Sequence, residues 1–516
     1  MLMSMWTGLC AAQKTYDLVR DFGAKPDNRT DCYAAMVRAT QVISQAGGGI
    51  LNIPKGKYYI GKIKITGGKN KNFITDIGFY NCKLLTIRGN GSTIRVNGHF
   101  LRTEDYNIFG VPTKYSYTET VIPFFIVNCS NVLLEDMILD GGVREMRKEK
   151  INEGNCSGIV IDDYGKKEFI SNNITIKNVT TNYFATDGIT IRCRGTNIRV
   201  SHCKAKFNGR QGMSIVGGNN IVIEHSEFDS TGHTGFYGGH APGAGIDVEC
   251  ENPELPIKNV LIKNCSMRGS SGFQIVTTVA SQNVHIDSCF IADESYGYSD
   301  GLRGIGMYSI NSSITNSVIF GTLQADIANQ PYSGNVAQQF TGNILYSGWR
   351  AVVSSDFSRP YNISDNIFIM LPNAFVNEYF PYIQNLNCTF NRNIIMMHDS
   401  KISLRRNEIT GLVQHVREAN NNYWLNGPAP AGSRNAGKYF YNISFDASKT
   451  GMQHVPQNAT GKGLGTTGVS LIPQTVLNSL NRYGLFTSYI QRNFNRDILV
   501  QAAAVKKELG VYRKRQ

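Results

Sequence analysis

Residues 197–203 read NIRVSHC, and the same phrase, Asn-apolar-x-apolar-x-polar-Cys/Ser, recurs through the middle of the chain. Each copy follows a Gly-apolar-x-apolar phrase, such as the GITI of residues 188–191, by a similar interval. Apolar residues that alternate with polar ones over so short a run predict a β-strand and not a helix. The copies begin at Asn131, Asn173, Asn197, Asn220, Asn259 and Asn283.

The spacing of these copies predicts the architecture. Asn173 and Asn197 are 24 residues apart, and Asn197 and Asn220 are 23 apart. A unit this short cannot bury an apolar face alone, so successive copies must stack and place like residues above like. The repeat therefore predicts an all-β fold, a right-handed single-stranded parallel β-helix. Asn before each strand suits such a stack, because Asn bonds the backbone of its own bend and tolerates left-handed dihedrals.

Cysteine usage indicates packing rather than chemistry. Cys203, Cys265 and Cys289 occupy one position of the repeat, and Ser226 replaces them once, which is typical of a column of small buried side chains. The eleven cysteines form no CxxC pair, and the nine histidines form no HExxH pattern, which disfavours a zinc site. We expect mostly free, buried thiols and no cofactor.

One long solenoid with caps accounts for most of the 516 residues, and no linker rich in Pro, Gly or Ser divides it. Residues 1–12 are apolar and end in small residues, which is typical of a secretory signal peptide remnant, and no later segment is long and apolar enough to span a membrane. We predict a secreted or periplasmic protein. The expected parts are the signal remnant at 1–12, an N-terminal cap at 13–60, the β-helix at 61–424 with insertions near 138–156 and 229–243, and a C-terminal extension with a capping helix at 425–516.

Within that extension, prolines and glycines favour a loop from about Leu425 to Thr467. Apolar residues at helical spacing then favour a helix from about Asn495 to Leu509, which Gly510 would end. Its expected role is to cover the last turn of the solenoid.

The first ordered segment reads DFGAKPD at residues 21–27, and an amphipathic run to Ala46, three glycines and IPKGKYY at residues 53–59 follow. This order resembles the amino-terminal cap of the pectate-lyase-like β-helix superfamily, which polygalacturonases and many phage tailspikes share. The resemblance implies a helix over the open first rung, with Thr30 as its N-cap and Gly47 ending it. Such a cap hides strand edges that would otherwise recruit other chains.

The net charge of +13, from 52 Lys and Arg against 39 Asp and Glu, predicts an anionic partner. No zinc finger, RNA-recognition phrase or helix-turn-helix pattern accompanies the basic residues, which disfavours nucleic acid. An acidic polysaccharide or oligosaccharide is the expected partner. Because trimerisation is common among tailspike relatives, a monomer and a homotrimer both stay open.

Two long steps interrupt the repeat, and both insertions lead into the Gly-apolar strand, so we expect them to overhang its outer face and form a groove. Neighbouring rungs lie about 4.8 Å apart, which brings outward side chains of successive rungs together. The expected site holds Asp162, Asp187, Arg192, Arg210, Gln211, Asp247 and Glu249 beneath a loop that carries His233, Tyr237 and His240.

Glycosidic hydrolysis needs two carboxyl groups roughly 5 to 9.5 Å apart. We predict that Asp187, Asp247 and Glu249 supply them and that the other members of the site bind substrate. Residues 185–188, Ala-Thr-Asp-Gly, are similar to the polygalacturonase Asn-Thr-Asp-Gly motif, and Asp187 matches its catalytic aspartate. That family's carboxylate pair one rung later is replaced here by residues 209–212, Gly-Arg-Gln-Gly, and its Gly-His-Gly and Arg-Ile-Lys phrases are missing. The acid would therefore come from Asp247 or Glu249.

Two other interpretations stay open. Pectate lyases, which resemble this chain in fold, use carboxylate-bound Ca²⁺ with an arginine; here Asp187, Asp247 and Glu249 could hold Ca²⁺ while Arg192 or Arg210 removes the proton. A non-catalytic β-helix could bind polysaccharide along the same groove. Mannuronan epimerases are a further relative, but Arg-Cys-Arg-Gly at residues 192–195 cannot supply their Asp-Pro-His-Asp signature.

Overall fold

The computed structural model describes a set of segments that together cover most of the chain up to residue 460. They are residues 13–62, 75–98, 120–143, 156–163, 170–232, 241–278, 280–293, 303–324, 336–347, 352–353, 360–370, 388–397, 418–426, 439–446 and 457–460. Within them the chain divides into two compact units, the first up to Arg210 with residues 216–219, and the second made of residues 211–215, 220–232 and those from 241 onward.

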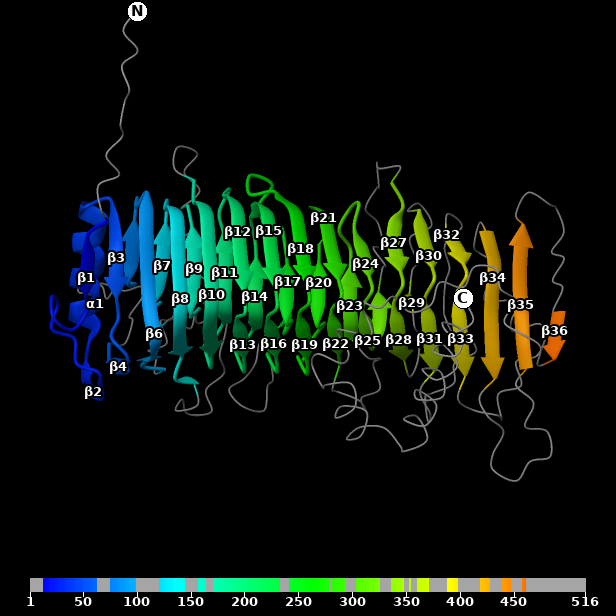
Figure 1. The fold of residues 1–516 in the computed structure, drawn as a ribbon, viewed down its shortest axis with the longest axis horizontal. Coiled ribbons are helices and arrows are strands. Elements are labelled where there is room, and N and C mark those ends of the chain that lie inside the picture. Colours follow the sequence, from blue (N-terminus) through cyan, green and yellow to red (C-terminus); the bar gives the residue numbers. More distant parts are fainter. Residues whose placement is uncertain are drawn as a thin grey trace, which may run out of the picture. The chain divides into compact units, whose positions relative to one another are not determined.

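The first unit contains two sheets of parallel strands, which Figure 1 draws in blue to cyan-green. The second sheet contains the Gly-apolar strands β9 and β11, and its strands pair in the order β5, β7, β9 and β11. They span Gly78–Tyr80, Phe124–Val127, Ile159–Asp162 and Asp187–Arg192. The first sheet contains β1 Thr15–Asp17, β2 Asp27–Asp31, β3 Gly48–Asn52, β4 Lys57–Ile60, β6 Leu84–Val96, β8 Ser130–Asp140, β10 Asn172–Asn182, β12 Thr196–Ser201 and β13 Lys204–Lys206.

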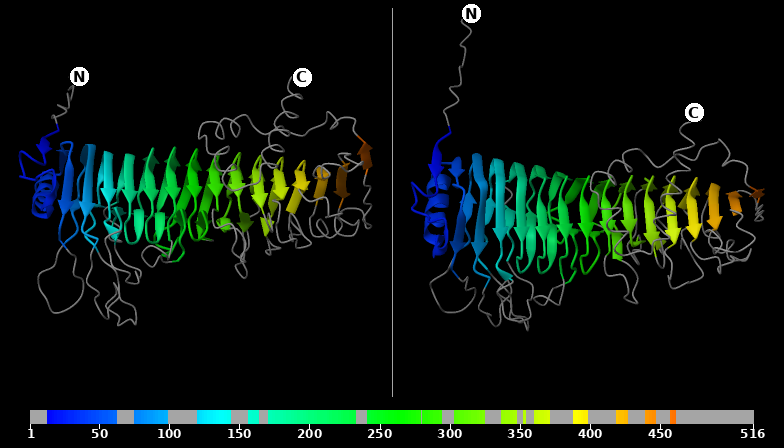
Figure 2. Two further views of the ribbon diagram at one scale, coloured as in Figure 1. Left: turned by 90° about the horizontal axis from the view of Figure 1, so that it is seen from below. Right: turned by 60° about the horizontal axis from the view of Figure 1, so that its bottom comes forward.

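The second unit repeats this plan, and Figure 2 shows its strands following one another in chain order from green to orange. The strands that continue the second sheet pair in parallel as β14 Gln211–Ile215, β17 Ile246–Val248, β20 Ile275–Thr277, β23 Arg303–Met307, β26 Thr322–Gln324 and β29 Val352–Val353. The other sheet contains the part of β15 Gly218–Glu224 that follows Asn219. It also contains β16 Glu227–Asp229, β18 Ile257–Lys263, β19 Ser266–Arg268, β21 Ser281–Asp287, β22 Phe290–Ala292, β24 Ser313–Thr315, β25 Val318–Phe320, β27 Gln338–Thr341, β28 Ile344–Ser347, β30 Tyr361–Ser364, β31 Ile367–Met370, β32 Cys388–Asn391, β33 Ile394–Met397 and β34 Glu418–Asn426.

The parallel pairing of successive copies of one repeat confirms the predicted β-helix. In β10 and β12, for example, Ile174 pairs with Ile198 and Ile176 with Val200, so like residues stack as the repeat requires. All four of these side chains are buried. The core therefore consists of apolar columns that run from rung to rung.

The Asn positions of the repeat have the predicted left-handed backbone. From Asn131 to Asn283 the six copies have φ between 53° and 61°. Their side chains also bond from rung to rung: Asn173 Nδ2 donates to Asn131 Oδ1 at 3.1 Å, and Asn197 Nδ2 donates to Asn173 Oδ1 at 2.9 Å. Asn thus serves both the bend and the contact between rungs.

The cysteine column is buried, as predicted. Cys203, Cys265 and Cys289 are at most 2% exposed, and all ten cysteines of the described residues are free. The Cys203 thiol donates to the carbonyl of Ile176 at 3.6 Å, and burial raises its pKa to about 12. A thiol kept neutral in this way is a packing group and not a nucleophile.

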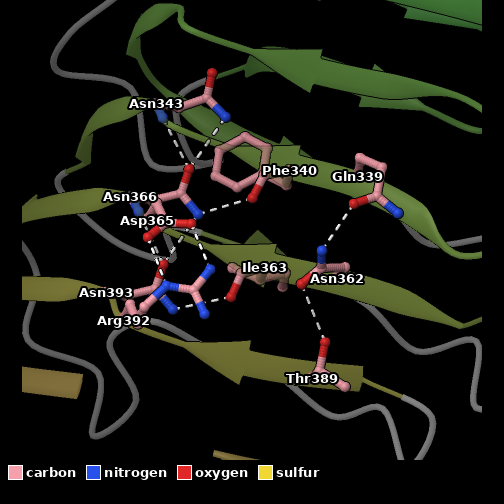
Figure 3. Close-up of polar contacts among 10 residues, drawn as sticks. All are labelled: Gln339, Phe340, Asn343, Asn362, Ile363, Asp365, Asn366, Thr389, Arg392 and Asn393. Atoms are coloured by element: carbon pink, nitrogen blue, oxygen red, sulfur yellow. Dashed lines mark hydrogen bonds and ion pairs between the residues drawn. The ribbon is translucent and has the colours of Figure 1, made fainter. Parts of the chain in front are cut away.

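Further along the chain the same position of the repeat carries asparagine (Figure 3). Asn343, Asn366 and Asn393 are at most 1% exposed. Asn366 Oδ1 accepts from the Asn343 backbone N–H at 2.9 Å, and Asn366 Nδ2 donates to the Phe340 carbonyl at 2.8 Å and to Asn393 Oδ1 at 3.0 Å. The amide column therefore satisfies backbone groups that the bend would leave unpaired.

Replacing Asn366 by leucine is expected to lower the free energy of unfolding by about 2–4 kcal/mol, because buried donors and acceptors on both neighbouring rungs lose their partners. Asn362 provides the matched control: it lies in β30, four residues before Asn366, but is only partly buried, and it bonds Gln339 on the rung before and Thr389 on the rung after. Asn362→Leu should cost less than about 1 kcal/mol. Equal losses in urea unfolding would contradict a structural role for the buried column.

The N-terminal cap differs from prediction at its start. The helix α1 spans Tyr33–Gln45, its N-cap is Cys32, and no side chain caps it. Thr30 instead belongs to β2, where Asp27 accepts from both its N–H and its hydroxyl, so it is not available as a cap. The end is as predicted, because Gly47 follows the helix with φ of 73° and donates its N–H to Ser44.

The C-terminal extension also needs a correction. The stretch expected to be a loop contains β35 Tyr439–Asp446 and β36 Gln457–Thr460. These strands pair antiparallel, β35 with β34 and β36 with β35. The predicted signal segment at 1–12 and the predicted helix at 495–509 lie outside the described residues. In the described part of the chain, no helix has the length and apolar character needed to cross a membrane.

Candidate functional site

The first unit brings Asp162 and Arg192 together. The parallel register of β9 and β11 places them opposite each other. Asp162 Oδ2 accepts from Arg192 Nε at 2.9 Å and from Nη2 at 2.5 Å. The carboxylate side chain is 3% exposed and the arginine 37% exposed, so the guanidinium of this neutral ion pair reaches the surface while the carboxylate stays buried.

Asp187 forms the second ion pair of this unit. It is the first residue of β11. Arg210 donates to both of its carboxylate oxygens, from Nε to Oδ1 at 2.9 Å and from Nη2 to Oδ2 at 2.6 Å. Thr190 also donates its hydroxyl to Asp187 Oδ2, at 3.2 Å. Every one of these bonds uses Asp187 as an acceptor, which suits a carboxylate and leaves no proton to donate.

Two charged residues of this site were not singled out from the sequence. Asp163 is fully buried and accepts from the Arg194 backbone N–H at 2.8 Å, and the Arg194 guanidinium lies 3.6 Å from the same carboxylate. Their positions in the sequence could have identified them, because Asp163 directly follows Asp162 and Arg194 lies two residues after Arg192. The ends of β9 and β11 thus carry a double row of ion pairs.

The second unit holds Gln211, Ser214 and Asp247 on two neighbouring strands. In β14 and β17, Ser214 pairs with Asp247. Gln211 Nε2 donates to Asp247 Oδ2, and Ser214 Oγ donates to Gln211 Oε1. All three residues are at most 2% exposed. Ser214 therefore fixes which way the Gln211 amide points, and Gln211 fixes the carboxyl group of Asp247.

Glu249 continues the β17 strand by one residue beyond Val248. Its N–H donates to the Ile215 carbonyl at 2.9 Å, so the backbone still follows β14 at this point. Residues two apart on a strand point to the same face and are about 6.6 Å apart at Cα. Asp247 and Glu249 therefore share one face, and Glu249 is partly exposed whereas Asp247 is 1% exposed.

The sequence predicted these carboxylates on an open outer face, and the structure corrects this for Asp162, Asp187 and Asp247, which are at most 2% exposed. Burial is tolerated because each of them has charged or amide donors. Asp187 and Asp247 belong to different units, so their cooperation as a catalytic pair stays a prediction. The predicted binding residues His233, Tyr237 and His240 lie outside the described residues.

Within the described residues no group of three or more His, Cys, Asp or Glu side chains is placed to hold a metal ion. Asp187, one of the three predicted Ca²⁺ ligands, already binds the guanidinium of Arg210 through both oxygens. A positive charge in that position repels a cation. Calcium binding stays a prediction, and no step is derived through it.

Replacing Asp187 by asparagine is expected to lower stability by about 3–5 kcal/mol, because it leaves the Arg210 charge, on a side chain that is 21% exposed, without its partner. Thermal unfolding of Asp187→Asn, Arg210→Gln and the double variant forms a double-mutant cycle. The double variant should be more stable than the sum of the two losses predicts. Strict additivity would contradict the ion pair.

Comparison with known proteins finds similarity only among solved structures. No protein-family model matches the sequence, and no curated protein matches it. Similar solved structures include the A-module of the mannuronan C-5 epimerase AlgE4 from Azotobacter vinelandii, which is 16% identical with a TM-score of 0.41, over 74% of this chain and 88% of that one. The Streptococcus pneumoniae surface adhesin PfbA is 15% identical with a TM-score of 0.46, over 84% and 98% of the two chains. The tailspike gp49 of Acinetobacter baumannii bacteriophage Fri1, a capsular polysaccharide depolymerase, is 11% identical with a TM-score of 0.35, over 80% and 62%.

Proposed function

We propose that this chain is a secreted enzyme that hydrolyses glycosidic bonds of an acidic polysaccharide, with Asp247 and Glu249 as its pair of carboxyl groups. The observation that carries the proposal is their placement on one face at the end of β17, one buried and one partly exposed. Two carboxyl groups about 5 to 9.5 Å apart are what glycosidic hydrolysis requires. A Cα separation of about 6.6 Å allows the side chains to span that range.

The surroundings of the two groups suggest different roles. Asp247 accepts a hydrogen bond from Gln211, which is itself oriented by Ser214, so its carboxyl group is fixed as an acceptor. This suits the group that activates water or attacks the anomeric carbon. Glu249 is partly exposed and is assigned as the acid that protonates the leaving oxygen.

The net charge of +13 supports an acidic polymer as substrate. The Arg192 side chain is 37% exposed and can donate hydrogen bonds to a ligand, although Asp162 balances its charge. A charged polymer would be drawn to the net positive charge of the protein over distances up to the Debye length, about 10 Å at 0.1 M salt. Binding should therefore weaken as salt is raised.

The hydrogen bonds of Arg192 and Arg210 favour hydrolysis over elimination. A lyase would use Arg192 or Arg210 as the base that removes a proton. Both guanidinium groups donate from Nε and Nη2 to a buried carboxylate, Asp162 or Asp187. A group that holds its protons in these bonds does not act as a base.

The test is to incubate the purified protein with polygalacturonate, alginate, hyaluronate and dextran, with and without EDTA. Reducing ends and the ultraviolet absorbance of unsaturated uronates are followed together. New reducing ends without absorbance, insensitive to EDTA, are the expected result. Rising absorbance that EDTA abolishes would contradict the hydrolase and support a calcium-dependent lyase. Binding of a polymer without cleavage would support a non-catalytic binding protein.

A further inference from the structure

Two aromatic residues of the first unit, Tyr183 and Phe207, occupy backbone positions that aromatic residues avoid. Their φ angles are 60° and 58°. Among the described residues, the other non-glycine positions with positive φ are held by Asn, Asp, His, Ser and Arg. A bulky side chain in this region is strained, and strain of this kind gathers at functional sites.

The two rings stack on each other across neighbouring rungs. Tyr183 directly follows β10 and Phe207 directly follows β13, whose last residues, Asn182 and Lys206, pair in register. The ring centroids are 5.3 Å apart and the planes differ by 9°. Tyr183 packs in turn on the buried cluster of Val143, Cys156 and Ala185. Phe207, in contrast, is 42% exposed, and it is the one aromatic side chain among the exposed large hydrophobic residues of the described part.

The bend that carries Phe207 is held firmly. Asn208 is 2% exposed, accepts from the Phe184 N–H at 3.0 Å and donates to the Thr181 carbonyl at 3.2 Å. Gly209 donates its N–H to Phe184 at 2.8 Å, and any Cβ at Gly209 would lie 2.2 Å from the Ala185 carbonyl oxygen. The exposed ring is therefore presented by a rigid corner, which lowers the entropy lost when a ligand binds.

The corner lies beside charged groups. Arg210 follows Phe207 by three residues, but its guanidinium is paired with Asp187, which balances its charge. Lys204 and Lys206 on β13 precede the ring, the first exposed and the second partly exposed. An exposed aromatic face within three residues of two lysines in the sequence suits an acidic sugar, whose apolar C–H face would cover the ring while its carboxylate meets a lysine.

We infer that Tyr183 and Phe207 form a binding subsite for one acidic pyranose unit of a polysaccharide, with Phe207 as the stacking surface. The inference rests on the proposed function insofar as it takes a polysaccharide as the ligand. It assigns the pair to binding and not to chemistry, since neither ring carries a group that the hydrolysis needs.

The experiment uses the full-length chain and the polymers of the panel, with dissociation constants measured by affinity gel electrophoresis in the Glu249→Gln background so that the polymer stays intact. Phe207→Asn removes the ring and suits the left-handed backbone, whereas Phe207→Tyr keeps a ring. His202→Asn is the matched control, because His202 is also left-handed, at φ of 55°, and is exposed.

Phe207→Asn should weaken binding of the acidic polymer about tenfold, while Phe207→Tyr and His202→Asn stay within about twofold of the parent. In the active chain Phe207→Asn should raise KM and leave kcat unchanged, as expected for a group that binds substrate and transition state alike.

Unchanged affinity in Phe207→Asn would overturn the subsite even if the wild type cleaves the polymer. Weak binding in both Phe207 variants, together with a clear fall in Tm, would assign the stack to folding. If the chain binds a polymer without cleaving it, the proposed hydrolysis fails and a Phe207→Asn loss of affinity still supports the subsite. Failure to bind every polymer overturns both.

Discussion

Replacing Asp247 by asparagine is expected to lower kcat by about 10²–10⁴-fold, the contribution typical of one positioned acid or base group. The amide keeps an oxygen that accepts from Gln211 but neither activates water nor attacks the sugar. Stability should change little, because the new side chain has the same shape and the same hydrogen bond. Turnover of the cleaved polymer and thermal unfolding of the same preparation are the two measurements.

Asp293→Asn is the matched control in the same unit. Asp293 is nearly as buried as Asp247, at 2% exposed, and it too accepts a hydrogen bond. Its donor is the backbone N–H of Arg303, at 2.6 Å. It lies outside the proposed site, so its variant should keep kcat whatever happens to its Tm. Wild-type turnover in Asp247→Asn, or an equal loss in both variants, would remove Asp247 from the catalytic machinery.

Replacing Ile246 by aspartate is expected to abolish cooperative folding. Ile246 is fully buried in β17, where it pairs with Met213 on one side and Ile275 on the other. A carboxylate at this position would be buried among apolar side chains without a donor, which costs several kcal/mol, comparable to the whole stability of many domains. Circular dichroism during heating should show no cooperative transition.

Ile246→Val is the conservative control, and it should cost only about 0.5–1.5 kcal/mol. The contrast with Asp247 is informative, because two adjacent residues of one strand face opposite sides. A cooperative transition near the wild-type Tm in Ile246→Asp would show that Ile246 does not face the core.

Much of the architecture could be predicted because it is local and repeated. The alternation in NIRVSHC places Ile198 and Val200 in the core. Because the copies are 23 to 24 residues apart, the next copy must bury its apolar residues at the same positions. The left-handed bend at Asn197 and the burial of Cys203 follow from the same phrase. Errors arose where the repeat ends. The sequence predicts Thr30 as a cap, but Asp27 occupies its hydrogen bonds, and it predicts a loop where the structure has β35 and β36.

The repeat alone predicts the parallel β-helix, its apolar columns and the strands on which the charged residues lie. Which of those charges meet becomes visible in the folded chain. Arg210 binds Asp187 from 23 residues away, Arg192 binds Asp162 from 30 residues away, and Gln211 orients Asp247 from 36 residues away. The physical reason is that a repeat fixes which face a side chain occupies, whereas its partner depends on the register between rungs and on loop lengths that no single phrase encodes.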